Sequence, residues 1–392
     1  MNRERIAILS NGVLASIIGI APVLLIISAA VNKGLSETQT SSWVFGSYVI
    51  AGLIGICFSL WKRLPICGSH SVPAAVLLGS ALMSFTLEEA AGSYLIAGLL
   101  MLGLGASDGF RKMVALLPIE IVMAMFAGTM MKYAVGIVTL TEEHVVIGAA
   151  CLTGFLAVSL FLRPFPPALG AIALGSLVCW LTGEFSRLQT GSFALPQLLL
   201  PEFSWQSVIA LSLPMVVLIL GTEGVQGITG LQMGGYKPPV NHMVIASGIG
   251  TMLSSFFGAH SANTAGIMTS VCASPEVGRP SERYKAALIT GLIMLGFGVF
   301  AGFLIPVVMS FPRYVIDMFT GFAILPVLMQ ALSMAFAGKS VSLASFAAFV
   351  VALSGVTILQ INAPLWSLLI GSAMMVAERN LRRSEASGGR EG

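Results

Sequence analysis

Charged residues are scarce in this sequence, and their scarcity excludes most soluble proteins. Asp, Glu, Lys and Arg make up 9% of the 392 residues, whereas a soluble domain carries roughly 25%. No C-x-x-C, H-E-x-x-H or P-loop sequence is present, and no basic block is interleaved with aromatic residues. We therefore expect no enzyme, no metal site, no cofactor and no nucleic-acid partner.

Long apolar runs fill the sequence instead. Hydrophobic residues make up 56% of the chain and the mean hydropathy is +0.92, which indicates an all-α polytopic membrane protein. Helices that pack closely in lipid need small residues, and the chain has 43 glycines. The apolar runs predict fourteen transmembrane segments, at about residues 10–31, 42–60, 66–84, 88–107, 115–133, 144–162, 168–183, 206–232, 242–257, 260–274, 284–306, 312–335, 341–358 and 363–379.

The distribution of Lys and Arg predicts how these segments are oriented. If the N-terminus is cytoplasmic, most basic residues fall on the cytoplasmic side, as the positive-inside rule requires. The exceptions are then Lys33, Lys132, Arg187 and Arg313. We therefore expect an integral protein of a bacterial inner membrane with both termini in the cytoplasm.

The two halves of the chain resemble each other. The connection from residue 184 to residue 205 separates segment seven from segment eight. Seven segments per half is an odd number, so the second half must enter the membrane from the opposite side. This pattern predicts a 7+7 inverted repeat, which is typical of secondary transporters. Three matches occur in order at a spacing of 190 to 193 residues: Pro22 with Pro214, His70-Ser71 with His260-Ser261, and residues 125–128 with residues 318–321.

Small polar residues interrupt segments three and ten and then give way to apolar sequence. We interpret each as unwound backbone followed by a half-helix, whose N-terminus offers N–H groups and partial positive charge to an anion near the membrane midplane. An alternative is that these polar side chains only satisfy the broken backbone. The predicted substrate-binding residues are His260, Ser261, Asn263, Thr264, His70, Ser71, Ser69 and Thr222.

Glu223 is the strongest candidate for proton coupling. It lies about sixteen residues into segment eight, roughly 24 Å along a segment of about 40 Å. An ionised carboxylate is costly at that depth, and a carboxyl group that exchanges protons near neutral pH is a suitable proton carrier. The alternative is a structural carboxyl group bonded to a neighbouring helix. Glu120 is interpreted as a helix-capping acid, and His144 as an interfacial residue.

The sequence around segment ten resembles the benzoate/proton symporter family of the BenE type. The resemblance is carried by residues 256–269, by residues 272–276 and 283–287 that follow, and by the loop at residues 234–240. It implies the fold shared with uracil/xanthine permeases and sulphate permeases. In that fold, residues 1–107 and 206–306 form a core domain, and residues 108–205 and 307–392 form a gate domain. The resemblance further implies alternating access of the core against the gate, often in a homodimer formed through the gate.

The resemblance implies a proton-coupled importer of a small organic anion, such as benzoate or a related aromatic carboxylate. Two features depart from the family pattern. Glu223-Gly224 stands where family members carry Gln-Asn, and His70-Ser71-Val72-Pro73-Ala74 stands where they carry an aromatic residue and Ser-Thr-Pro-Gly. Glu223 is similar to the segment-eight glutamate of nucleobase permeases, although Ala262 replaces their second glutamate. A nucleobase/proton symporter and an anion channel therefore remain as alternatives.

Overall fold

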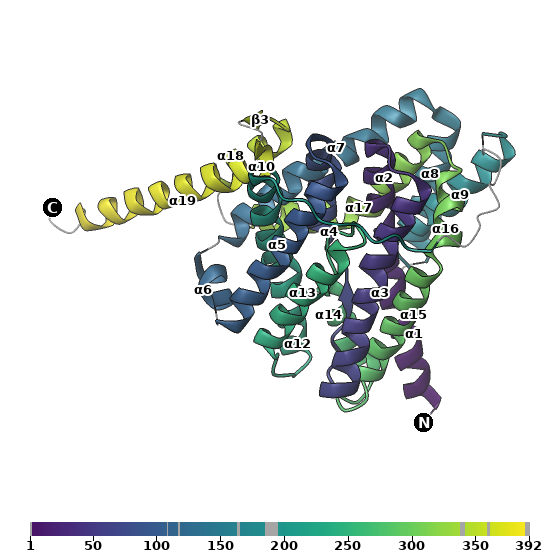
Figure 1. Cartoon of the computed structure of the whole chain (residues 1–392), viewed down its shortest axis with the longest axis horizontal. Helices are drawn as coiled ribbons and strands as arrows, with labels where there is room; N and C mark the ends of the chain where they lie inside the picture. The colour runs from purple at the N-terminus through teal and green to yellow at the C-terminus, as the bar shows by residue number, and fades with distance from the viewer. Residues whose placement is uncertain are drawn as a thin grey trace.

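Helices account for nearly all of the regular structure in the computed structural model (Figure 1). The structure describes residues 2–107, 109–116, 118–162, 165–184, 195–337, 342–358 and 361–388. Residues 185–194 of the predicted connection between the halves, including Arg187, lie outside these residues. Helix α19 (Ala363–Gly388) projects from the bundle of the other helices in Figure 1.

The first part of the chain alternates long and short helices. Its elements are α1 (Asn2–Ile20), α2 (Val23–Lys33), α3 (Glu37–Lys62), β1 (Gly68–Ser69), α4 (Val72–Ala81), the 3-10 helix η1 (Leu82–Ser84), α5 (Leu87–Ala106), α6 (Gly109–Leu116), α7 (Ile119–Glu143), α8 (Val145–Phe161) and α9 (Ala168–Leu181).

The second part begins with a helix that contains two π-helical stretches, η2 and η3. Its elements are α10 (Trp205–Ser207), η2 (Val208–Ser212), α11 (Leu213–Leu218), η3 (Ile219–Gly224), α12 (Val225–Met233), α13 (Val240–Ser255), β2 (Asn263–Thr264), α14 (Ile267–Ala273), the 3-10 helix η4 (Pro275–Val277), α15 (Tyr284–Val299), α16 (Ala301–Met309), α17 (Arg313–Ala335), α18 (Leu343–Ser354), β3 (Thr357–Ile358), β4 (Ile361–Asn362) and α19.

Each of the fourteen predicted segments overlaps at least one of these helices. Within the described residues, six helical stretches are long and apolar enough to cross a membrane. A seventh results if α15 and α16, which meet at a bend of 66°, count as one span. The chain is thus a helical membrane protein with several apolar helices. The count of fourteen spans, their orientation and the inverted repeat stay predictions.

Glycine residues bring the axes of neighbouring helices together. A Cβ atom on Gly98 of α5 would lie 2.7 Å from the carbonyl oxygen of Gly248 on α13. A Cβ atom on Gly154 of α8 would lie 2.1 Å from the carbonyl oxygen of Gly170 on α9. Neither contact leaves room for a side chain, so glycine allows the close helix packing that proteins use in lipid.

Two groups of helices pack mainly among themselves. In the first group, α3 packs on α15 and α5 packs on α13. In the second group, α7 packs on α17 and α18, and α8 packs on α9. The short helices α4 and α14 lie near the boundary between these groups, where α4 contacts α7.

The interrupted parts of predicted segments three and ten meet at the centre of the fold, and we call this meeting point the crossing. Strands β1 and β2 pair antiparallel, with Gly68 opposite Thr264 and Ser69 opposite Asn263. The N–H of Ala265 extends this pairing by donating to the carbonyl oxygen of Cys67 at 2.8 Å. Helices α4 and α14, of 10 and 7 residues, start directly after the two strands. Extended backbone followed by a short helix is the local structure that the sequence predicts for both motifs.

Serine side chains satisfy the backbone donors that the crossing leaves unpaired. The N–H of Ser71 donates to Oγ of Ser261 at 2.8 Å, and the N–H of Thr264 donates to Oγ of Ser247 at 3.0 Å. All four residues are buried. A buried backbone N–H needs a partner inside the protein when no water can reach it, so these hydroxyl groups stabilise the interrupted segments.

We predict that Ser261→Ala lowers the stability of the folded protein. The change removes the acceptor of the Ser71 N–H, and an unsatisfied buried donor costs about 1–3 kcal/mol. The measurement is thermal unfolding of the purified protein in detergent, followed by tryptophan fluorescence. Ser10→Ala is the control, because the exposed Ser10 hydroxyl bonds only within its own helix. Equal unfolding temperatures for the two variants would show that the Ser261 hydroxyl does not support the crossing.

Candidate functional site

A cavity lies between the short central helices and the α7–α17 pair. The space between its lining atoms is about 370 Å³, which includes space open to solvent. The elements α4, α14, η3 and α12 line one side, and α7 and α17 line the other. The lining residues are Val72, Pro73, Ile267, Thr222, Glu223, Gln226, Met123, Phe126, Val327, Gln330 and Ala331.

Glu223 is the acidic residue in this lining. It lies on the π-helical stretch η3, a local geometry that is frequent at functional sites. One carboxylate oxygen, Oε2, accepts a hydrogen bond of 2.8 Å from the N–H of Gly266, immediately before α14. The carboxylate also lies near the backbone N–H of Val72, the first residue of α4. Glu223 therefore connects the starts of both short helices.

No cation offsets the charge of an ionised Glu223 among the described residues. The ion pairs found there, within 4 Å, are Glu4 with Arg279 and Glu282 with Lys285, both away from the cavity. An ionised carboxylate that is half-buried in a membrane protein is costly without a charged partner. Uptake of a proton removes this cost, so the site is suited to exchange a proton.

The neighbouring Thr222 faces its own helix. Its hydroxyl donates to the carbonyl oxygen of Leu218 at 2.6 Å, one turn earlier, although the residue also contributes to the cavity wall. Thr222 and Glu223 are the two residues of the predicted site that line the cavity.

His70 and His260 lie in the crossing behind the cavity, with their ring centres 5.4 Å apart. The indole N–H of Trp43 donates to Nδ1 of His260 at 3.0 Å, and Nε2 of His260 lies 3.1 Å from the carbonyl oxygen of Ser71. An indole N–H can only donate, so Nδ1 accepts and Nε2 carries the proton of a neutral imidazole. Nε2 of His70 is paired with the hydroxyl of Tyr48 at 3.1 Å. Both rings thus connect the crossing to α3.

The other predicted residues also belong to the crossing. Ser69 and Thr264 lie in the strand pair, and Ser71 and Ser261 bond to each other. The Asn263 amide donates to the carbonyl oxygen of Thr264 at 3.1 Å. Within the described residues, the buried Oδ1 of Asn263 and Nδ1 of His70 have no hydrogen-bond partner. Substrate binding by His260, Ser261, Asn263, Thr264, His70, Ser71 and Ser69 stays a prediction, and in this structure none of them lines the cavity.

Two amide side chains in the cavity wall were not among the predicted residues. Gln226 lies one turn after Glu223 on the same helix, so its spacing could have indicated it. Gln330 lies in an apolar stretch of α17, four residues after Pro326, and a lone amide there is costly enough to mark a site. The apolar wall residues Met123 and Phe126 carry no comparable signal, because similar side chains fill every segment.

Glu120 and His144 lie away from the cavity. Glu120 is exposed in the first turn of α7, after the N-cap residue Pro118, where an acidic side chain complements the helix dipole. His144 joins α7 to α8 and stacks on Tyr314 with ring centres 3.5 Å apart. Among the described residues, no three His, Cys, Asp or Glu side chains are placed to hold a metal ion.

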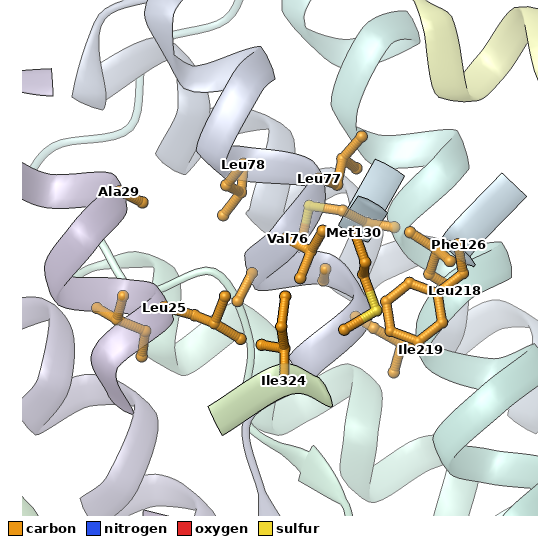
Figure 2. Close-up of a cluster of buried hydrophobic side chains, with 14 of the residues drawn as sticks. Leu25, Ala29, Val76, Leu77, Leu78, Phe126, Met130, Leu218, Ile219 and Ile324 are labelled. Carbon is orange, nitrogen blue, oxygen red and sulfur yellow. The ribbon is translucent and has the colours of Figure 1, made fainter. Parts of the chain in front are cut away.

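An apolar cluster, shown in Figure 2, lies next to the cavity. It includes Leu25 of α2, Val76 and Leu77 of α4, Met130 of α7 and Ile324 of α17, all at most 1% exposed. Phe126 belongs both to this cluster and to the cavity wall. Towards the other end, Gln330 is exposed and Gln226 is half-buried. The cavity therefore borders close-packed apolar side chains on the side of the cluster.

Comparison with known proteins identifies the family. Residues 3–377 match the family model described as BenE, benzoate membrane transport protein. Inner membrane protein YdcO of Escherichia coli is 26% identical over 377 residues, covering 94% of this chain and 96% of YdcO. The benzoate membrane transport protein of Acinetobacter baylyi is 24% identical over 352 residues, covering 89% of each chain.

Solved structures share the fold at low sequence identity. The transmembrane domain of the cyanobacterial bicarbonate transporter BicA superposes with a TM-score of 0.64 at 16% identity, covering 95% of this chain and 98% of that one. SLC26A9 superposes with a TM-score of 0.67 at 15% identity, covering 95% of this chain and 64% of that one. These relatives are membrane transporters and not enzymes. The family match over nearly the whole length shows that this chain belongs to the BenE family of benzoate membrane transport proteins, and that it is a membrane transporter of a small molecule.

Proposed function

We propose that this transporter imports a small aromatic carboxylate, most simply benzoate, together with a proton. The observation that carries the proposal is Glu223, a carboxyl group that has no cationic partner among the described residues and lies in the wall of the cavity. The family match and the name of the Acinetobacter baylyi relative support benzoate as the substrate.

The cavity offers an aromatic carboxylate both an apolar and a polar wall. The ring would pack against Met123, Phe126 and Val327 on the α7–α17 side. The carboxylate would lie towards the backbone N–H of Gly266 and the amide of Gln226, on the side of the short helices. This arrangement leaves the histidines in a supporting position rather than in contact with substrate.

Coupling follows from competition between two negative charges. When Glu223 is ionised, its carboxylate holds the N–H of Gly266 and repels a second carboxylate. Two unit charges 4 Å apart interact by about 4 kcal/mol at an effective dielectric constant of 20, which disfavours binding roughly a thousandfold. A proton on Glu223 removes the repulsion and frees the Gly266 donor. Proton and anion would then bind together and cross together.

The packing of the helices supports alternating access. We propose that residues 1–107 and 206–306 move as a core domain against a gate domain of residues 108–205 and 307–392. The cavity lies where α4, α14 and η3 of the core face α7 and α17 of the gate. With the N-terminus in the cytoplasm, the apolar cluster would close the outer side and the structure would face inward. Fourteen spans in a 7+7 inverted repeat and a homodimer through the gate domain complete this proposal.

We predict that Glu223→Gln still binds and exchanges benzoate but no longer accumulates it against a gradient. The amide keeps the shape of the carboxyl group but cannot carry a proton. The measurement is uptake of labelled benzoate into proteoliposomes whose external solution is more acidic than their interior. Uptake by protein-free vesicles, which reports passive permeation of benzoic acid, is subtracted. In this variant, uptake with the pH gradient should be no greater than uptake at equal pH on both sides. Counterflow, the exchange of labelled for unlabelled benzoate across the membrane, should persist.

Glu120→Gln is the matched control, because the exposed Glu120 lies outside the cavity. It should keep gradient-driven uptake. Full uphill uptake by Glu223→Gln would remove Glu223 from the coupling mechanism. If the wild-type protein takes up benzoate but shows no counterflow, the result would favour a channel over a carrier.

A nucleobase/proton symporter is the second candidate, because one carboxyl group and two amides line the cavity. Glu223, Gln226 and Gln330 could pair with the ring N–H and carbonyl groups of a nucleobase.

We predict that excess unlabelled benzoate blocks labelled benzoate uptake, while uracil and xanthine at the same concentration leave it unchanged. Uptake of labelled uracil that benzoate does not inhibit would instead select the nucleobase function.

A further inference from the structure

A second cavity lies on the far side of the apolar cluster. Helices α2, α4, α7 and α17 surround about 730 Å³ of empty space, and its polar lining includes Asn32, Lys132, Tyr133 and Asp317. We call this cavity the outer vestibule. It shares no lining residue with the cavity at Glu223, here called the central cavity.

The central cavity, the apolar cluster and the outer vestibule follow one another along the same helices. On α7, Phe126 lines the central cavity, Met130 belongs to the cluster and Lys132 lines the vestibule. Lys132 follows Phe126 by six positions along the helix, a rise of about 9 Å. Helix α4 has the same order, from its first turn at the central cavity to Gly79 at the vestibule.

Helix α17 gives the same order in the reverse direction along the chain. Gln330 lines the central cavity, Ile324 belongs to the cluster and Asp317 lines the vestibule. Helices α4, α7 and α17 therefore place the vestibule and the central cavity on one axis. The apolar cluster is the barrier between them (Figure 2).

Lys132 supplies the positive charge of the vestibule. Its ammonium group lies 5.1 Å from the ring centre of Tyr133 and, among the described residues, forms no ion pair within 4 Å. The carboxylate of Asp317 accepts a hydrogen bond of 2.7 Å from the hydroxyl of Ser28 and is further offset by the charge of Arg313, one turn away. Lys132 and the phenol of Tyr133 thus remain as donors for an anion.

The described basic residues of the predicted outer side lie in or near the vestibule in the sequence of its helices. Four basic residues were predicted on the non-cytoplasmic side, and Lys132 lines the vestibule directly. Lys33 follows the lining residue Asn32, and Arg313 lies four residues before Asp317. Arg187 is outside the described residues. Positive charge at the mouth of a path for anions raises the local concentration of the substrate.

We propose that the outer vestibule is a second carboxylate-binding site, where the substrate anion docks on Lys132 before the apolar cluster opens. The proposal rests on the proposed function and on the orientation that places this end outside. The carboxylate would pair with the ammonium group of Lys132 and the hydroxyl of Tyr133. The aromatic ring would contact the apolar side of the vestibule at Leu140.

The test is binding of labelled benzoate to the purified full chain in nanodiscs, measured by equilibrium dialysis at low ionic strength. We expect two sites per chain in the wild type, one site in Lys132→Gln, and two sites in the charge-conserving control Lys132→Arg. Glu223 and the central cavity are intact in both variants. In proteoliposomes, Lys132→Gln should raise the KM for external benzoate several-fold, leave the maximal rate unchanged and weaken the dependence of KM on salt.

The vestibule site is overturned if the wild type binds one benzoate per chain and Lys132→Gln binds one as well, with an unchanged KM. The proposed function then still stands. Absence of benzoate binding from folded wild-type protein overturns both. Matching unfolding temperatures of the two Lys132 variants show that any difference between them comes from the charge and its geometry rather than from misfolding.

Discussion

The structure depends on how two interrupted segments satisfy their backbone hydrogen bonds away from water. A continuous helix pairs its own N–H and C=O groups, but a segment that unwinds in the membrane must find partners elsewhere. Here each interrupted segment supplies partners to the other, through the β1–β2 pair and the bond from the Ser71 N–H to Ser261. Trp43 and Tyr48 of α3 hold the two histidines beside this crossing. Because the segments are bonded to each other, α4 and α14 begin side by side.

This crossing determines the electrostatics of the central cavity. The first N–H groups of two short helices face the same space, and Glu223 reaches them from the π-helical stretch η3. The N–H groups of Gly266 and Val72 offset part of the cost of an ionised carboxylate there, although no cation among the described residues is paired with it. The same donors suit a substrate carboxylate. In the proposed function, proton and anion are coupled by one physical effect, the exclusion of a second negative charge from a small space.

The apolar cluster separates the polar cavities at its two ends. Leu25 and Val76 come from the proposed core domain, and Met130 and Ile324 come from the proposed gate domain, so a movement of one domain against the other would change their packing. A seal made of close-packed side chains needs no specific bonds to be broken when it opens, only the separation of apolar surfaces. The bond from Ser28 to Asp317 crosses the same boundary at the vestibule and adds one polar contact to the closed arrangement.

The sequence by itself determined that the protein is a helical membrane protein, where its helices form and which two segments are interrupted. It also singled out Glu223 as a carboxyl group buried deep in an apolar segment. Each follows from composition or from the cost of polar groups in lipid, which act locally along the chain. Only the tertiary structure decided which polar side chains face the cavity. In unwound backbone no simple periodicity fixes the direction of a side chain, so spacing could not show that His70 and His260 lie behind the cavity. Gln226 and Gln330 both line the cavity because helices far apart in the chain pack together. Local sequence patterns cannot predict such a contact.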